Sequence, residues 1–242
     1  MNVNYDNVFK DIVKNIKGTP TVLLHSCCAP CSSQVLARLS DYFLVTVLYY
    51  NPNIEPFSEY EKRKEEQKRF IETFPSKNKI SILDCDYENE KFKCIAKGLE
   101  DAPEGGERCH KCYNLRLEKT AILAKENGFD YFCTTLTVSP FKNSRILNEI
   151  GSNLEKLYDV KYLYSDFKKE DGYKKSIEYS KKYNLYRQNY CGCIYSKNNL
   201  RKLNHSLNIN YFLQYTSFFN TLLLTPPIIQ LLSLLLLVIV DP

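Results

Sequence analysis

The stretch LLHSCCAPCSS, residues 23–33, decides the fold. A short apolar run predicts a strand over 21–26, and the pattern after it predicts a helix over 33–42. Three cysteines, Cys27, Cys28 and Cys31, lie between the two. Cysteine is among the most often buried residue types. A cluster at the end of a strand nevertheless leaves four interpretations open: packing, a disulfide, a redox pair or a metal site.

The same alternation of short apolar runs and longer helical patterns continues along the chain. It predicts a doubly wound α/β fold with a mostly parallel sheet flanked by helices, like the adenine-nucleotide-alpha-hydrolase (HUP) folds. A cysteine-rich metal site is expected at the C-terminal edge of the strands. Further strands are predicted at 43–51, 79–86, around 129–139 and around 160–167; helices are predicted at 1–18, 55–74, 87–100, 110–128, 143–158 and 173–184.

Composition narrows the class of protein. The chain has 242 residues, enough for one α/β domain, and ten cysteines. The N-terminus reads as an amphipathic helix without a secretory pattern, so we expect a reducing, cytoplasmic location. In such a compartment clustered cysteines indicate metal binding or catalysis more than structural disulfides. The formal net charge of +5 is compatible with RNA binding but does not establish it.

A second cysteine motif, CHKC, contains Cys109 and Cys112. The spacing of three puts both thiols on one face of a helical first turn, where thiolate is favoured over thiol. A zinc ribbon would need a second CxxC, which the sequence lacks. Adjacent cysteines such as Cys27 and Cys28 fit neighbouring irons of a cluster better than a tetrahedral zinc. The spacing therefore favours a [4Fe–4S] cluster over zinc, and both stay open.

The third motif, CGC, contains Cys191 and Cys193. Two cysteines separated by one residue can close a small, strained disulfide ring, and Gly192 gives the backbone the freedom to do so. Strained disulfides are easily reduced, so the pair suits a redox switch. The alternative is two unrelated buried thiols. The remaining cysteines, Cys85, Cys94 and Cys133, are predicted to be small buried hydrophobic residues.

Two further sequence features limit the possible functions and the extent of the folded domain. A nucleotide-binding loop of the SGGxDS kind would follow the first strand, but cysteines stand in place of its glycines, which argues against ATP chemistry. Residues 204–242 are predicted as an apolar tail separate from an α/β metalloenzyme domain over 1–203. Its last apolar run, 228–240, is shorter than the ~20 residues that span a bilayer. A spanning segment, a membrane-surface contact and a docked appendage all remain open for it.

Five motifs together resemble the epoxyqueuosine reductases of the QueH family: LLHSCCAPCS, YYNPNIEPFSEYEKRKEEQ, RCHKCYNLRL, TTLTVSPFKN and DFKKEDGYKKSIEYSKKYNLYRQNYCGCIYS. They follow in order between residues 20 and 201. The resemblance implies a tRNA-modifying oxidoreductase that catalyses the last step of queuosine synthesis, removing the epoxide oxygen of epoxyqueuosine at the wobble position. The apolar tail after about Asn204 is foreign to the family.

The resemblance also implies roles for the cysteines. Cys27, Cys28, Cys109 and Cys112 would hold a [4Fe–4S] cluster, and Cys191 and Cys193 would form a redox-active disulfide served by an external electron donor. Cys31 stands where some members carry an acidic residue next to a possible second iron. Candidate proton donors are His110, Tyr113, Asp171 and Tyr190, and His25 reads as a hydrogen-bonded core residue.

The partner implied is tRNA with a modified wobble base. Candidate phosphate contacts are Arg63, Arg116, Lys142, Arg145, Lys168 and Lys169; candidate base contacts are Tyr49, Tyr50, Asn51, Asn53 and Phe141. Two rival functions remain. One is an iron–sulfur-dependent tRNA sulfur transferase, which the missing ATP loop disfavours. The other is a zinc-stabilised RNA-binding module without catalysis.

Overall fold

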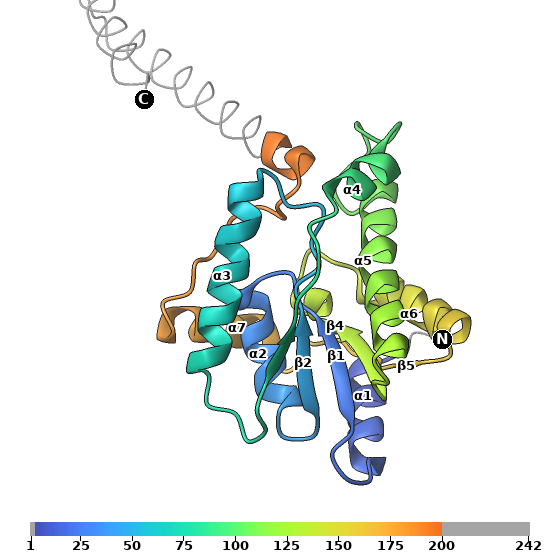
Figure 1. The fold of residues 1–242 in the computed structure, drawn as a ribbon, viewed down its shortest axis with the longest axis vertical. Coiled ribbons are helices and arrows are strands. Elements are labelled where there is room, and N and C mark those ends of the chain that lie inside the picture. Colours follow the sequence, from blue (N-terminus) through green and yellow to red (C-terminus); the bar gives the residue numbers. More distant parts are fainter. Residues whose placement is uncertain (1–2, 200–242) are drawn as a thin grey trace, which may run out of the picture. The chain divides into compact units, whose positions relative to one another are not determined.

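A five-stranded, all-parallel sheet forms the centre of the computed structural model, which describes residues 3–199 (Figure 1). Every neighbouring pair of strands runs in the same direction, and Thr21 pairs with Leu44 at the start of the first pair. The order across the sheet is β3-β2-β1-β4-β5. The strands are β1 (Thr21–His25), β2 (Leu44–Leu48), β3 (Ser81–Leu83), β4 (Tyr131–Thr134) and β5 (Lys161–Tyr162).

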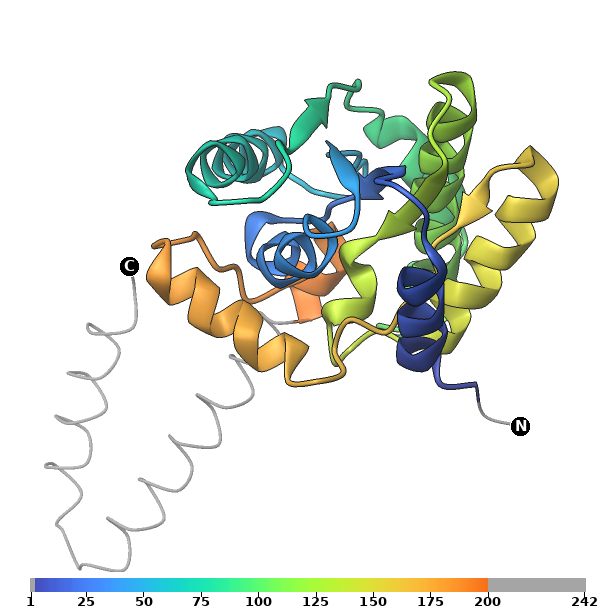
Figure 2. The ribbon, with the colours of Figure 1, turned by 90° about the horizontal axis from the view of Figure 1, so that it is seen from below.

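Helices cover both faces of this sheet (Figure 2). Because side chains of a strand alternate between faces, Val22 and Leu24 of β1 enter the core beneath α1, α2 and α3, whereas Leu23 enters the core beneath α5 and α6. The helices are α1 (Tyr5–Asn15), α2 (Ala29–Leu39), α3 (Phe57–Thr73), α4 (Asn89–Ala96), α5 (Glu107–Glu126), the short 3-10 helix η1 (Thr135–Val138), α6 (Ser144–Tyr158) and α7 (Gly172–Lys182).

The predicted α/β class is confirmed, and the sheet is wholly parallel. Two helix starts differ from the prediction in a way that matters for the site. Helix α2 begins at Ala29 rather than residue 33, because Pro30 suits a first helical turn, so Cys31 belongs to the helix. Helix α5 begins at Glu107 rather than residue 110, so the whole CHKC motif is helical.

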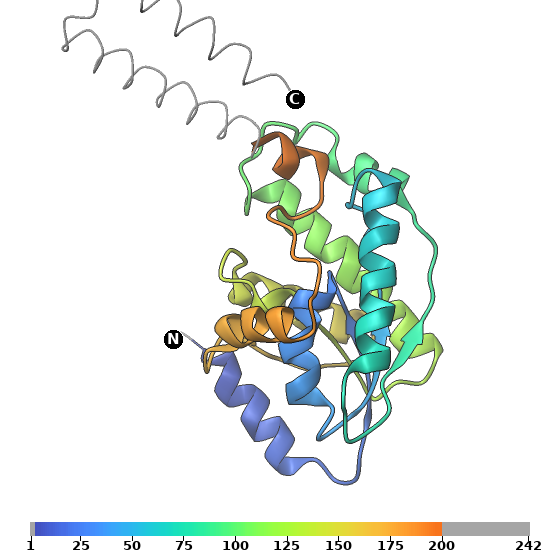
Figure 3. The ribbon, with the colours of Figure 1, turned by 90° about the vertical axis from the view of Figure 1, so that its left-hand side faces the viewer.

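The strand order brings the ends of β1 and β4 side by side. From β1 the chain proceeds outward to β2 and β3, and it then returns to the other side of β1 as β4. At such a reversal the loops after the two strands diverge, and ligands of α/β proteins bind there. Figure 3 shows the segment after α7, in orange, rising from α7 towards this C-terminal edge of the strands.

Residues up to Ile194 form one unit. The predicted boundary between residues 203 and 204, and the tail of 204–242 with its three alternatives, lie outside the described residues and stay predictions. Within residues 3–199, no helix combines the length and the apolar character needed to cross a bilayer.

Candidate metal centre

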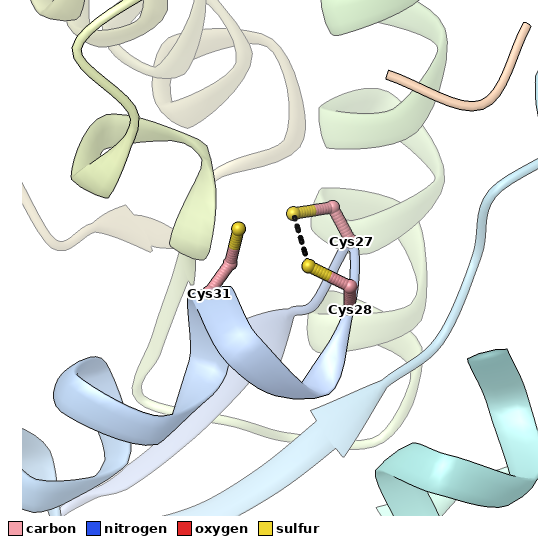
Figure 4. Close-up of side chains that lie close together, drawn as sticks. All are labelled: Cys27, Cys28 and Cys31. Atoms are coloured by element: carbon pink, nitrogen blue, oxygen red, sulfur yellow. Dashed lines mark hydrogen bonds between the residues drawn. The ribbon is translucent and has the colours of Figure 1, made fainter. Parts of the chain in front are cut away.

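Three cysteines gather where β1 ends and α2 begins. Cys28 is the N-cap of α2 in an extended conformation, and Cys27 precedes it. Because Cys31 lies in the first turn of α2, its thiol turns back towards the other two (Figure 4). The sulfurs of Cys27 and Cys28 are 3.8 Å apart, and all three sulfurs lie within 4.8 Å of one another. This spacing would allow the three sulfurs to bind one metal ion.

Threonine on the neighbouring strand end fixes the position of Cys27. The Thr135 hydroxyl, in the turn that follows β4, accepts a hydrogen bond from the Cys27 amide at 3.3 Å. The same hydroxyl lies 3.6 Å from the Cys27 sulfur and donates to it. The cysteine group is therefore anchored across the point where the strand order reverses. Sequence reasoning did not single out Thr135, because its contact with Cys27 depends on the pairing of β1 with β4.

Hydrogen bonds among the three cysteines shift their pKa values in opposite directions. Hydrogen bonds from the thiols of Cys28 and Cys31 hold the pKa of Cys27 well below its usual value. The same hydrogen bonds raise the pKa of Cys28 and of Cys31. The three sulfurs are therefore linked through shared protons, and a metal ion that binds them as thiolates would displace those protons.

The CHKC motif lies at the start of α5. Cys109 accepts a hydrogen bond from the amide of Gly105 at 3.3 Å, and Cys112 is buried. Burial raises the pKa of Cys112 to about 11, so desolvation outweighs the predicted preference for thiolate at the helix start. Across residues 3–199, Cys27, Cys28 and Cys31 are the one group of three or more ligating side chains within 4.8 Å, so Cys109 and Cys112 are not drawn into that group here.

Two hydrogen bonds hold the backbone of the CGC motif, one from Arg63 of α3 and one from the amide of Glu55. The carbonyl of Cys191 accepts a hydrogen bond from Arg63 Nη1 at 3.2 Å, and the carbonyl of Gly192 accepts one from the amide of Glu55 at 2.9 Å. Gly192 has φ of +120°, and a Cβ there would lie 2.9 Å from Cγ1 of Ile54. Only glycine fits this close approach. Both flanking cysteines are thiols in this structure, not a disulfide.

Two cations face the thiols. Burial of Arg116 lowers its pKa, but the thiols of Cys112, Cys191 and Cys27 raise it by more. Burial of Lys142 acts in the same way, and the thiols of Cys191, Cys27 and Cys31 again prevail, so its pKa is raised. Cys27, Cys112 and Cys191 come from three distant parts of the sequence, yet all act on Arg116. One cysteine of each motif therefore acts electrostatically on Arg116.

His25 is the core residue that the sequence predicted. It is fully buried, and its Nε2 lies 3.1 Å from the carbonyl of Tyr50 while its Nδ1 lies 2.9 Å from the hydroxyl of Thr134. A carbonyl only accepts, so Nε2 carries the proton and Nδ1 accepts from the threonine hydroxyl. Burial, helped by the charge of Arg116, lowers the pKa of His25 to about 3. The ring is neutral and stiffens the strand end.

Several predicted RNA contacts are wrong. Arg63 and Arg116, expected to meet phosphates, are 2% and 1% exposed. Tyr49 and Tyr50, expected to stack on bases, are also buried, because both follow β2 into the cores beside α3 and α5. Asn51 and Asn53 are 1% exposed as well, and Asn51 Nδ2 donates to the carbonyl of Ser26 at 2.8 Å.

Other RNA candidates do lie on the surface. Phe141 is 79% exposed, next to Lys142 in the loop before α6. Arg145 pairs with Glu149, and Lys168 pairs with Asp166. Of these candidates, Phe141 is the large apolar side chain left open to solvent beside the cysteine region.

The three cysteines outside the motifs differ in their exposure to solvent. Cys133 is fully buried in β4, as predicted. Cys85 is half-buried, and its thiol donates to the carbonyl of Tyr49 at 3.3 Å. Cys94 is exposed, so its predicted burial is wrong. Helix α4 buries Phe92 and Ala96, which are four residues apart, and Cys94 lies on the opposite side between them.

Comparisons with known proteins agree on one family. A family model described as epoxyqueuosine reductase QueH matches residues 22–199. Among curated proteins of that name, the one from Streptococcus pyogenes serotype M1 is 43% identical over 199 residues, covering 80% of this chain and 78% of the relative. The Staphylococcus epidermidis protein is 44% identical over 80% of this chain and 84% of its own. The Thermotoga maritima protein is 37% identical over 73% and 90%.

Proposed function

This chain belongs to the epoxyqueuosine reductase QueH family and converts epoxyqueuosine to queuosine in tRNA; we propose that it does so with a thiolate-bound [4Fe–4S] cluster. The observation that carries the proposal is the group of three sulfurs, those of Cys27, Cys28 and Cys31, within 4.8 Å of one another at the end of β1. The electrostatic effect of Cys27, Cys112 and Cys191 on Arg116 supports it. The strand order with helices on both faces supports the HUP-like variant of the fold.

The residues present suit a metal–sulfur centre. Thiolates are the ligands that iron–sulfur clusters take, and Cys27, Cys28, Cys109 and Cys112 would hold the cluster. The closeness of Cys31 to the first two supports a role for it as ligand to a second iron. When bound, such a centre supplies electrons and a Lewis acid for the epoxide oxygen.

Cys191 and Cys193 would supply the reducing equivalents. Opening the epoxide to an alkene and releasing its oxygen as water takes two electrons and two protons. A dithiol that becomes a disulfide gives up two electrons and two protons, so the exchange balances. An external thiol reductant of the cytoplasm would then restore the dithiol. The hydrogen bonds from Arg63 and Glu55 hold this segment against α3, which supports its presence in the active site.

Among the candidate proton donors, we favour Tyr113. It is buried, and burial raises the pKa of its phenol, which therefore keeps its proton at neutral pH. Lys142, Cys109 and Cys191 act on the same hydroxyl. Tyr190 remains a candidate, and the guanidinium of Arg63 lies 5.0 Å from its ring.

Metal analysis tests the cluster. Protein purified without oxygen should be brown and carry roughly four iron and four sulfide per chain. Cys112→Ser should lose most of this iron, whereas Cys94→Ser, a matched change of an exposed cysteine on α4, should lose none. A colourless protein with one zinc and no sulfide would contradict the proposal.

A turnover assay tests the dithiol. Cys191→Ser should keep its iron but lose turnover when the only reductant acts through the dithiol. With tRNA from cells that lack the activity, the product is read by nucleoside analysis. Normal turnover by this variant would remove Cys191 from the reaction and leave the cluster assignment untouched.

A further inference from the structure

Arg116 is a buried cation without a carboxylate partner in the described part of the chain. It lies on α5, four residues after Cys112, and its side chain is held among apolar residues of the α5 core. The residue is 1% exposed. Its Nε donates to the carbonyl of Cys112 at 3.1 Å, and its guanidinium lies 5.6 Å from the ring of Tyr113.

One of its nitrogens is unsatisfied. Nη2 of Arg116 has no hydrogen-bond partner, although it is shielded from solvent. A guanidinium does not lose its proton in a protein, so the residue cannot escape the cost of burial by becoming neutral. An uncompensated buried charge is strongly destabilising. The positive charge of Arg116 is therefore expected to be balanced by a nearby anion.

The structure restricts what that negative charge can be. No carboxylate within residues 3–199 forms an ion pair with Arg116. An exposure of 1% leaves no access for a phosphate of the RNA backbone. His25, its imidazole neighbour, is neutral. The candidates that remain are the sulfurs of Cys112 and Cys27, which become anionic thiolates when they bind a metal.

We propose that Arg116 is a positioning residue whose fixed charge compensates the anionic metal–thiolate centre and helps to retain it. The proposal rests on the proposed function, since it needs thiolates that carry a metal. Arg116 acts through Cys112, whose carbonyl it binds, and through its charge on the sulfurs around it. Groups that orient and balance metal ligands in this way affect metal affinity nearly as much as the ligands themselves.

Iron retention is the decisive measurement. Arg116→Met keeps an unbranched apolar stem and removes the charged guanidinium. The purified, iron-loaded full-length protein should release iron to a chelator roughly 10–100-fold faster than the wild type. Its cluster should also show a more negative reduction potential, because a nearby positive charge favours the reduced, more anionic form. Arg116→Lys keeps the charge and should release iron far more slowly than Arg116→Met.

Arg38→Met is the matched control. Arg38 is also largely buried, but its partner is Asp6 at 2.9 Å, beside α1 and away from the cysteine motifs. This variant should lose stability and release iron at the wild-type rate. Arg116→Gln, which can still donate to the Cys112 carbonyl, replaces Arg116→Met if the methionine variant does not fold.

Thermal unfolding separates charge from packing. If Arg116 is uncompensated without metal, Arg116→Met should raise the midpoint of the metal-free chain by roughly 2–8 °C and lower that of the iron-loaded chain. Equal destabilisation of both forms, or iron release at the wild-type rate with an unchanged potential, would overturn the proposal. A wild-type protein that holds no iron would instead refute the cluster itself, so the two failures are distinguishable.

Discussion

Helices α3 and α5 both bury an arginine beside the cysteine motifs, and they compensate its charge differently. Arg63 on α3 pairs with Glu59, one turn before it, at 2.7 Å. Arg116 on α5 has a backbone carbonyl and a tyrosine ring, but no carboxylate in the described structure. Arg63 completes its own ion pair and clamps the Cys191–Gly192 backbone. Nη2 of each arginine lacks a hydrogen-bond partner, so the difference between the two residues lies in charge. The carboxylate of Glu59 balances the charge of Arg63, whereas Arg116 depends on charge from the sulfurs.

Removing the carboxylate of Glu59 would leave Arg63, like Arg116, without an acidic partner. Among the predicted changes, this one has the largest expected effect on stability. Glu59→Ala would make Arg63 as unpaired as Arg116, at a position where the side chain is 1% exposed. Breaking a buried pair in this way should lower the free energy of unfolding by about 3 kcal/mol. Chemical denaturation measures the loss.

The control for that variant is Glu65→Ala, an exposed partner of Lys68 on the same helix, with an expected loss below about 0.5 kcal/mol. If Glu59→Ala costs no more than Glu65→Ala, the charge of Arg63 is balanced by Cys28 and the two helices behave alike.

A substitution at Gly192 tests the contact between Arg63 and the Cys191–Gly192 backbone. Gly192→Ala adds a methyl group 2.9 Å from Ile54 Cγ1 and 3.1 Å from Arg63 Nη1, in a backbone conformation that alanine rarely adopts. We expect a loss of about 1–3 kcal/mol. Turnover should fall further than iron content, because the CGC segment is displaced while Cys112 on α5 is untouched.

Gly98→Ala is the matched substitution, since Gly98 also has positive φ but open space around its Cβ position. It should cost about 1 kcal/mol and leave turnover unchanged. Equal effects of the two substitutions on turnover would mean that the fit against Arg63 does not hold the CGC segment.

A second paired arginine, Arg38, extends the comparison to α1 and has the smallest expected effect. Burial alone would raise the pKa of Asp6, but hydrogen bonds from Lys10 and Arg38 hold it below its usual value. The pair therefore stabilises the fold above the unfolded-state pKa of about 3.9, and this contribution is lost as the pH falls through the lower, folded-state pKa.

Asp6→Asn should accordingly cost about 1 kcal/mol near pH 7, and the difference from the wild type should shrink below about pH 4. Thermal midpoints measured from pH 7 to pH 3 check this. A difference that stays constant over the range would show that the charge of Asp6 is irrelevant to its role.

Local patterns predicted the elements that build the site. The apolar run before Cys27 forms β1, and Asn143 caps α6 by accepting from the Arg145 amide. Both depend on near neighbours in the chain. Helix starts were less predictable: α2 begins at Ala29 and α5 at Glu107, both earlier than the apolar periodicity indicated. Polar first turns carry little periodic signal, so the membership of Cys31 in α2 emerged only from the structure.

Burial of charged residues was the main point that pattern reasoning missed. Arg63 and Arg116 are typical phosphate-binding residues by type, and each lies on a helix with a mixed, polar composition. Whether such a residue faces solvent or the interior depends on what the rest of the chain packs against it. For Arg63 this includes Cys191, 128 positions away.

The amino-acid sequence by itself determined the α/β class, the succession of strands and helices and the three cysteine motifs, because each depends on periodicity or spacing within a short segment. The tertiary structure decided which of these motifs meet, which arginines lie inside and which of them has a partner. Those properties arise from contacts between segments that are distant in the chain, and pairing β1 with β4 is what brings Thr135 to Cys27. No local pattern encodes the charge balance of a site assembled in that way.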